Sequence, residues 1–289
     1  MKSLLCERRD LLKSPIAVRE TGMLDGLQRL HEALQTYVRP ATFPVAIRMI
    51  APGGPWPEKT RFPKRDFGQQ IAICQGFAMA RHYGWIIGMR GEDVSCPLAK
   101  VVWGFEPMLD YYLNGMTCAG MYTETPAAGA VSEAQVDKWE FHQWEGVIAA
   151  PLHRASFEPH VILIYGNSAQ VMRLVVARLW KTGGRLTSSF SGRIDCADAV
   201  ITTMKTDECQ VILPCYGDRV FGQAQDDEMA FTIPLSKIEW IIEGLEGTHK
   251  GGIRYPIPKF LRYTGIYPDH YMEMERQWKM EKDVKEREE

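Results

Sequence analysis

The chain has 289 residues, of which 45% are hydrophobic and 24% charged, so it can bury the core of one large domain or of two interlocked halves. Its net charge of −2 predicts no basic surface, and we expect it to bind neither nucleic acid nor a membrane surface. The sequence contains no apolar run of about eighteen residues, which a transmembrane helix would require. Charged residues at positions 7–10 interrupt the only apolar patch near the start, so we expect no secretory signal and a cytoplasmic location.

Cysteine usage also favours a reducing compartment. The seven cysteines, an odd number, are Cys6, Cys74, Cys96, Cys118, Cys196, Cys209 and Cys215. Without a secretory signal, this count favours free thiols, metal ligands or a redox site over a disulfide framework.

The first part of the chain alternates between helix and strand patterns. Leucines at three- and four-residue spacing predict a helix that ends near Val38. An apolar, β-branched run at 43–50 predicts a strand that leads into a Pro/Gly-rich loop. Residues 66–83 have the periodicity of one helix that ends at Gly84, which places Cys74 in the middle of that helix.

The next predicted helix begins with a cysteine. After a predicted strand at 85–90, Ser95 is the expected N-cap, Cys96 lies at the helix start and Pro97 lies in the first turn. A further helix is expected over 132–144, with Ser132 as its N-cap.

The second part repeats this alternation. We expect strands within 145–154 and 160–166, a helix over 167–182 and a helix led by Cys196. Two strands within 210–235 and a helix over 234–247 are expected to follow. The charged segment 272–289 is either a solvated helix or a frayed end.

The two parts resemble each other in the order of their elements. Each has an apolar strand, a helix that contains Ala-Arg, a glycine stop and a helix led by a cysteine. We predict an α/β (or α+β) fold with two similar strand-helix-strand-helix halves in one compact domain, and either internal duplication or chance explains the similarity. A pseudo-twofold axis between the halves would bring Cys96 and Cys196 into one shared site.

The predicted organisation has three parts. Residues 1–39 form an N-terminal helical cap, residues 40–265 a main domain with halves at about 40–150 and 151–265, and residues 266–289 a charged tail.

Cysteines at helix starts are candidate thiolates, because free backbone N–H groups and the helix dipole stabilise an anionic sulfur. This reasoning selects Cys96 and Cys196, while Cys215 is expected to end a strand near Arg219. Cys74 is the fourth candidate, although a mid-helix cysteine is also typical of core packing. Four thiolates suit a [4Fe–4S] cluster or a structural zinc ion, and the alternative is a set of buried thiols that hold no cofactor.

Several other features have two interpretations. The Cys96-Pro97 pair is consistent with haem or another tetrapyrrole, but proline at a helix start also explains it. Arg219, near the carboxylates at 226–228, is either a catalytic substrate clamp or part of a charged hairpin. Four aromatic residues could line a pocket or pack in the core: Trp103, Tyr111, Tyr112 and Tyr122. The sequence lacks a Walker A loop, a GxGxxG motif and a GxSxG motif, which argues against common nucleotide-binding and serine-hydrolase folds.

Several stretches resemble an uncharacterised prokaryotic family, domain of unknown function 169, which is common in anaerobic bacteria and archaea. They cover about residues 40–265 and are EDVSCPLAKVVWGF, HVILIYGNSAQVMRLV, CADAV, LPCYGDRVFGQAQDDEMAFTIPL and IEWIIEGLEG. The resemblance implies that Cys96, Cys196 and Cys215 are pattern positions. Its anaerobic setting favours iron–sulfur chemistry.

The sequence thus predicts an iron–sulfur protein that acts in anaerobic redox or cluster-assisted metabolism of a small organic substrate. The expected ligands are Cys74, Cys96, Cys196 and Cys215, and Arg219 is the catalytic candidate. Such a protein would be an oxidoreductase or a cluster-dependent lyase that meets a small-molecule substrate or an electron-transfer partner. The alternative is a non-catalytic tetrapyrrole-binding protein or an accessory subunit of a larger enzyme, and homo-oligomerisation is left open.

Overall fold

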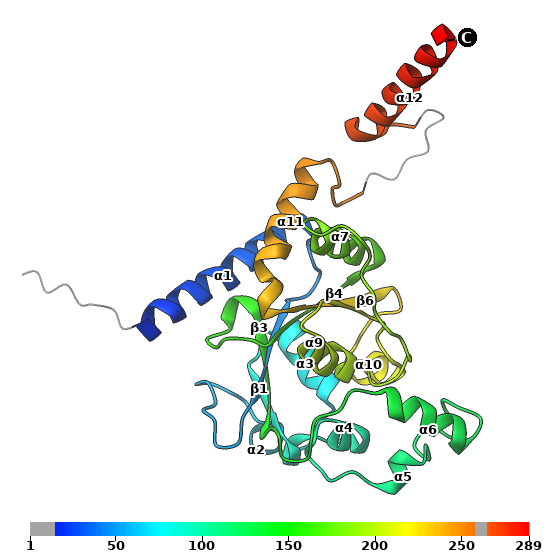
Figure 1. Cartoon of the computed structure of the whole chain (residues 1–289). Helices are drawn as coiled ribbons and strands as arrows, with labels where there is room; N and C mark the ends of the chain where they lie inside the picture. Colours follow the sequence, from blue (N-terminus) through cyan, green and yellow to red (C-terminus); the bar gives the residue numbers. More distant parts are fainter. Residues whose placement is uncertain (1–14, 258–264, 289) are drawn as a thin grey trace, which may run out of the picture.

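A six-stranded sheet forms the centre of the computed structural model, which describes residues 15–257 and 265–288 (Figure 1). The strand order is β2-β3-β1-β4-β6-β5, and all neighbouring strands are antiparallel. The strands are β1 (Val45–Ile50), β2 (Ile87–Arg90), β3 (Gly146–Pro151), β4 (Val161–Asn167), β5 (Gln210–Ile212) and β6 (Glu228–Pro234). Each segment predicted to contain a strand does so.

Helices cover both faces of the sheet, because alternate residues of each strand present apolar side chains to opposite faces. In β1, Val45 and Ile47 belong to one hydrophobic core, and Ala46 belongs to the other. The core that contains Ala46 is covered by α1 (Pro15–Tyr37), α7 (Ser168–Leu179) and α11 (Ile238–Lys250). The opposite core is covered by α3 (Ile73–Tyr83), α4 (Pro97–Val102), α8 (Asp195–Ala197) and the π-helical turn Asp198–Thr202. These three layers confirm the α/β class.

Shorter helices connect these layers. They are α2 (Pro63–Phe67), α5 (Asp110–Leu113), α6 (Pro126–Gln135), α9 (Thr203–Thr206) and α10 (Tyr216–Phe221), with 3₁₀ turns at Gly91–Asp93, Leu152–Arg154 and Leu235–Lys237. Because α8, the π-helical turn and α9 follow one another directly, the segment 195–206 is helical throughout.

Internal duplication is not confirmed. If β1 is exchanged with β4, β2 with β5 and β3 with β6, the same strand order results when it is read from the opposite edge of the sheet. Two equivalent halves would require this. However, α3 packs in one core with Val45, whereas α7 packs in the other core with Ala46. A twofold axis that exchanges adjacent antiparallel strands runs perpendicular to the sheet and would keep equivalent helices on one face. The helices therefore break the symmetry that the strands suggest.

The prediction of one helix over 66–83 was wrong. Gly68 has φ 69° and ends α2 in the left-handed conformation, which glycine adopts without strain. Ile71 then forms a bridge with Val94, and α3 begins only at Ile73. The apolar period continues across this break because Phe67 and Ile73 pack on the same core.

The N-cap predicted at Ser132 was also wrong. The N-cap of α6 lies seven residues earlier, at Thr125, whose hydroxyl accepts a hydrogen bond from the Ala128 N–H at 3.2 Å. Pro126 occupies the first turn, where the lack of an N–H group is tolerated. Ser132 lies inside this helix, which ends at Gln135, so the rest of the predicted helical segment, 136–144, is not helical.

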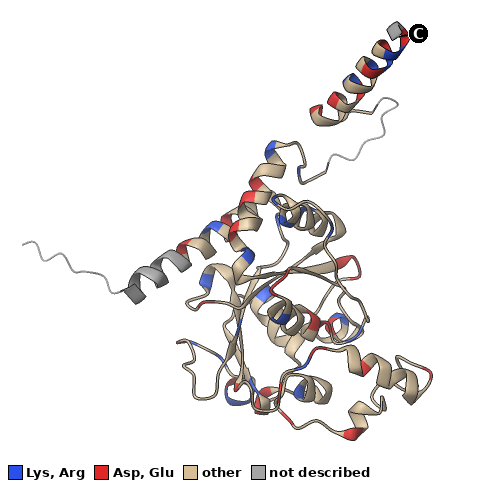
Figure 2. Cartoon of the chain, in the orientation of Figure 1, with Lys and Arg blue, Asp and Glu red and all other residues tan. Residues whose placement is uncertain are grey.

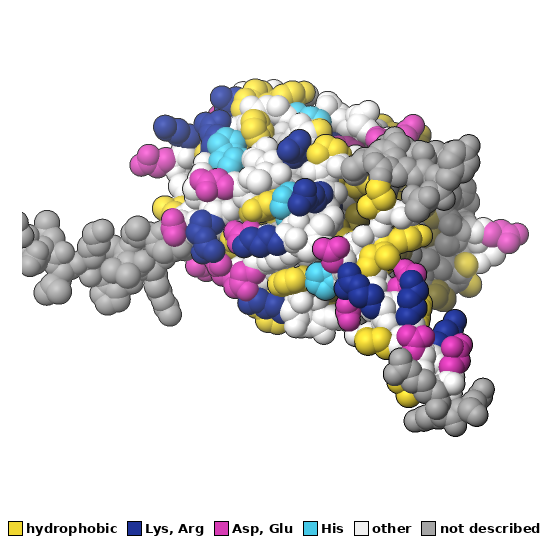
Figure 3. All heavy atoms as spheres, turned by 90° about the horizontal axis from the view of Figure 1, so that it is seen from above, with side chains coloured by type: hydrophobic (Ala, Val, Ile, Leu, Met, Phe, Trp, Pro, Cys, Tyr) yellow, Lys and Arg dark blue, Asp and Glu magenta, His cyan; other side chains and the backbone are white. Residues whose placement is uncertain are grey.

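The charged tail is helical from Asp269 to Glu288, as α12, and both signs of charge occur along it (Figure 2). This confirms the solvated-helix alternative for the tail. On the face seen in Figure 3, basic, acidic and apolar side chains are interspersed. Within the described ranges, no helix is long and apolar enough to cross a membrane.

Candidate functional site

A cavity of about 410 Å³ brings together the four cysteines selected from the sequence. Cys74, Cys96, Cys196 and Cys215 all line it, together with apolar residues and with Arg193 and Asp195. We call this space the thiol cavity. The four cysteines come from distant parts of the chain, so only the tertiary fold places them around one space.

Two of the four cysteines come from the first half of the chain. Cys74 is the second residue of α3 and not a mid-helix residue as predicted, because α3 begins at Ile73. Cys96 is itself the N-cap of α4, where the sequence favoured Ser95, and its sulfur accepts a hydrogen bond from the Ala99 N–H at 3.5 Å. Both sulfurs therefore lie at helix starts.

The other two cysteines also lie at helix starts. Cys196 is the second residue of α8, as predicted. Cys215 was expected to end a strand, but β5 already ends at Ile212 and Cys215 is the N-cap of α10. The Cys74 thiol lies 3.9 Å from the Gly217 carbonyl oxygen, to which it donates a hydrogen bond, and this contact links α3 to α10.

Two further described cysteines lie outside the lining of the thiol cavity. Cys118 is buried and donates a hydrogen bond to Glu133 Oε1 at 3.4 Å. Cys209 is buried in the core on the opposite face of the sheet. Cys6 lies outside the described residues. Cys118 and Cys209 therefore serve as matched controls for any role of the cavity thiols.

Three of the four cavity thiols hold their protons more strongly than a free cysteine does. Burial raises the pKa of Cys215 to about 12, raises the pKa of Cys74, and raises the pKa of Cys196 well above its ordinary value. For Cys196, loss of hydration therefore outweighs the helix start, which by itself favours a thiolate. A metal that binds a thiol displaces its proton, so metal binding at these thiols would be coupled to proton release.

Two buried carboxyl groups beside the cysteines were not selected from the sequence. Asp195 directly precedes Cys196, and Asp218 follows Cys215 by three residues. Both are at most 4% exposed, and the Tyr165 hydroxyl donates a hydrogen bond to Asp218 at 2.7 Å. Burial, reinforced by the Asp218 carboxylate, raises the pKa of Asp195 well above its ordinary value, and burial also raises the pKa of Asp218. These raised pKa values favour a protonated carboxyl group beside the sulfurs.

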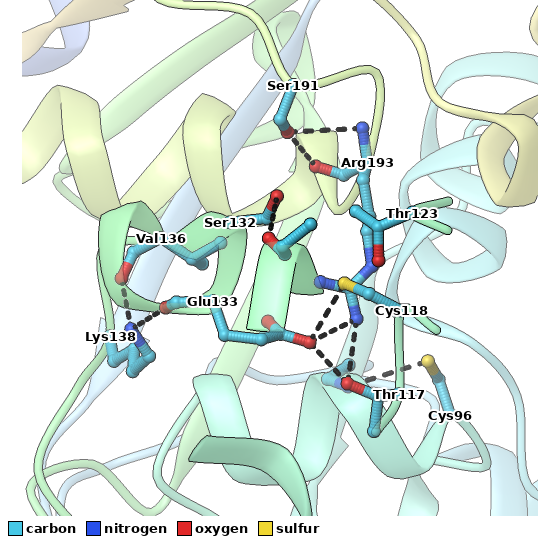
Figure 4. A network of polar contacts seen from close by, with 12 residues as sticks. Cys96, Thr117, Cys118, Thr123, Ser132, Glu133, Val136, Lys138, Ser191 and Arg193 are labelled. Atoms are coloured by element: carbon cyan, nitrogen blue, oxygen red, sulfur yellow. Dashed lines mark hydrogen bonds and ion pairs between the residues drawn. The ribbon is translucent and has the colours of Figure 1, made fainter. Parts of the chain in front are cut away.

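A buried ion pair lies at the edge of the cavity (Figure 4). Arg193 comes from the loop before α8, and its Nη2 lies 2.6 Å from Glu133 Oε1 on α6 and 3.1 Å from the Thr117 hydroxyl. The Tyr122 ring lies 5.4 Å from the guanidinium carbon. Arg193 precedes Cys196 by three residues, and this proximity was the only sequence signal for it.

Arg219, the predicted catalytic residue, does not line the thiol cavity. Its guanidinium donates a hydrogen bond to the Gln225 carbonyl. Of the neighbouring acids, Glu228 pairs with the buried Arg81 at 3.0 Å. The charged-hairpin interpretation fits these contacts better than a substrate clamp at the cysteines.

The four aromatic residues have different environments. Tyr122 lines the cavity, as anticipated. Trp103 and Tyr112 are buried in the core, whereas Tyr111 is exposed. One residue of the four is therefore available to a ligand at the cysteines.

In the described part of the chain, no group of three or more His, Cys, Asp or Glu side chains is arranged to hold a single metal ion. Four thiolates around one zinc ion lie about 3.8 Å from each other, as a Zn–S bond of about 2.3 Å and tetrahedral geometry require. The described cysteines form no such single-ion site.

Comparison with known proteins places the chain in an established family. Residues 33–244 match the family described as DUF169, uncharacterised ArCR, and the chain belongs to it. This match confirms the predicted family and contains all four cavity cysteines.

A curated relative is similar over a shorter stretch. The chain is 33% identical over 100 residues to uncharacterized protein MJ0308 of Methanocaldococcus jannaschii. This stretch is 34% of the present chain and 43% of that protein, so the chain spans less than half of the relative's length. No solved structure matches the chain.

Proposed function

We propose that this protein binds a [4Fe–4S] cluster in the thiol cavity through Cys74, Cys96, Cys196 and Cys215. In this proposal it acts in the cytoplasm, in anaerobic redox or cluster-assisted chemistry on a small organic molecule. The observation that carries the proposal is that these four cysteines, distant in sequence, line one cavity.

The set of donor atoms supports a cluster. Four cysteine sulfurs are the usual ligands of a [4Fe–4S] cluster, and each sulfur binds a different iron atom. The ligands of a cluster are therefore more widely separated than those of one zinc ion. Four cysteines that line one cavity supply this set of donors.

The surroundings of the cysteines support chemistry beyond storage of a cluster. The cavity volume of about 410 Å³ lies within the range of small-molecule pockets, about 300–1,000 Å³. The carboxyl groups of Asp195 and Asp218 provide a proton donor next to the sulfurs. These features favour a cluster-dependent enzyme over a carrier protein.

Anaerobic purification with metal analysis tests the proposal. We expect a brown protein with broad visible absorption, about four iron atoms and about four acid-labile sulfides per chain. Reduction with dithionite should produce an electron paramagnetic resonance signal. A colourless protein that keeps its fold and its full thiol titre after anaerobic purification and reconstitution with iron and sulfide would overturn the proposal.

Single cysteine variants identify the ligands. Replacement of Cys74, Cys96, Cys196 or Cys215 by alanine should lower the iron content, whereas Cys118→Ala and Cys209→Ala should retain it. If the two control variants lose as much iron as the cavity variants, the cavity is not the cluster site. A sharp Soret band instead of broad absorption would favour the alternative, a tetrapyrrole-binding or accessory protein.

A further inference from the structure

Arg193 differs from the other buried arginines in how it uses its nitrogen atoms. Among the described residues, the arginines that are less than 9% exposed are Arg81, Arg173, Arg178 and Arg193. All three nitrogens of Arg178 are hydrogen-bonded, and Arg81 and Arg173 each leave only Nε without a partner. Arg193 leaves both Nε and Nη1 without a partner, although its side chain is 4% exposed.

Buried N–H groups without partners are rare in folded proteins, because they lose water and gain nothing in return. Of the four buried arginines, Arg193 is the one that lines the thiol cavity. Its position is fixed by Glu133 and Thr117, which both bind Nη2. The remaining nitrogens of Arg193 are thus held at the cavity wall with donor capacity to spare.

The other walls of the cavity limit what can bind there. Ile73, Leu98 and Phe221 contribute apolar surface, and Arg193 is the one cation among the lining residues that the structure describes. Tyr122 packs against the guanidinium and is 39% exposed. A ligand that fits these walls has one anionic group and a small apolar or aromatic body.

We infer that the thiol cavity binds a small organic carboxylate, which accepts a hydrogen bond from a free N–H group of Arg193 beside the cysteines. A guanidinium keeps its charge at every physiological pH and donates strong hydrogen bonds to carboxylates. A singly charged carboxylate suits this site better than a phosphate, because Glu133 already shares the charge of Arg193. Both free nitrogens are shielded from bulk water, so neighbouring side chains rearrange before a carboxylate reaches either of them.

The inference deepens the proposed function by giving a substrate class to its cavity, and it can be tested separately from the cluster. Isothermal titration calorimetry of the full chain under anaerobic conditions compares the affinity for benzoate with the affinity for its uncharged analogue benzamide. We expect benzoate to bind at least ten times more tightly than benzamide. Iron content is measured on the same samples.

Two variants test whether Arg193 is responsible. Arg193→Lys keeps the charge beside Glu133 but lacks the planar guanidinium, and it should weaken benzoate binding at least tenfold without loss of iron. Arg178→Lys alters another buried arginine–glutamate pair, remote from the cavity, and should leave benzoate binding unchanged. If Arg193→Lys does not fold, the comparison of benzoate with benzamide in the unaltered protein still decides the question.

Each result has a distinct meaning. The inference is overturned if benzamide binds as well as benzoate, if benzoate does not bind at millimolar concentration, or if the two lysine variants behave alike. Iron with no carboxylate binding would refute the inference and leave the cluster proposal standing. Carboxylate binding that depends on Arg193, in a protein that takes up no iron, would refute the cluster proposal and leave the inference standing.

Discussion

His160 makes the stability of this fold depend on pH. Its ring Nδ1 accepts a hydrogen bond from the Met49 backbone N–H at 3.1 Å, and its ring centroid lies 5.8 Å from that of Trp144. Burial, and to a lesser extent the charge of Arg48, lowers the pKa of His160 from 6.5 to about 4. Protonation would place a hydrogen on Nδ1 and break the bond to Met49.

The sign and size of the effect follow from the two pKa values. The folded state holds the neutral ring, so the stability contribution is complete above about pH 6.5 and is lost as the pH falls toward about 4. The full difference between folded and unfolded states corresponds to about 3 kcal/mol, of which about 2 kcal/mol is lost by pH 5.

Urea unfolding of the wild type and of His160→Gln at about pH 7.5 and about pH 5 measures this contribution. Glutamine can accept the Met49 hydrogen bond but does not titrate. The stability advantage of the wild type over His160→Gln should therefore fall by about 2 kcal/mol at the lower pH. The exposed His270, changed to glutamine, serves as the control and should show no such fall. An advantage that is equal at both pH values would refute the reasoning.

Three further predictions concern the buried pair, a close helix contact and the thiols. Glu133→Gln should destabilise the fold by about 3–5 kcal/mol in urea unfolding, because it leaves the Arg193 charge buried and unpaired, and adding Arg193→Gln should restore part of the loss. Gly244→Ala should lower the melting temperature by several degrees, since a Cβ there would lie 2.0 Å from a backbone oxygen of α7, whereas Gly26→Ala, with 3.8 Å of room, should not. Ferrous iron uptake should release protons and strengthen as the pH rises from about 6 to about 8, because burial raises the pKa of Cys215 to about 12; a titration without proton release would contradict this prediction.

Local patterns predicted the elements of this protein better than their ends. The apolar run of β4 and the capped helix α7 appear where the sequence placed them, because strand and helix periods are properties of neighbouring residues. The break at Gly68 was missed, since both helices around it face the same core and preserve one apolar period. That break decides whether Cys74 lies in the middle of a helix or at its start.

The candidate site was only partly predictable. Cys96 and Cys196 follow from local helix starts, and Cys215 was selected although its setting, a helix N-cap, was not foreseen. The protonated state of the buried thiols depends on how deeply other segments cover them, which no local pattern records. The pair of Arg193 and Glu133 was missed for a similar reason, because its partners lie sixty residues apart in sequence.

By itself, the sequence determined the strands, most of the helices, the family and a short set of candidate cysteines. The tertiary structure decided the order of strands in the sheet, the opposite placement of α3 and α7, and the meeting of four cysteines around one cavity. It also separated Arg219 from these cysteines and brought Arg193 to them. The physical reason is that secondary structure depends mainly on neighbours along the chain, whereas a site depends on contacts between segments that only the packing of the whole sheet brings together.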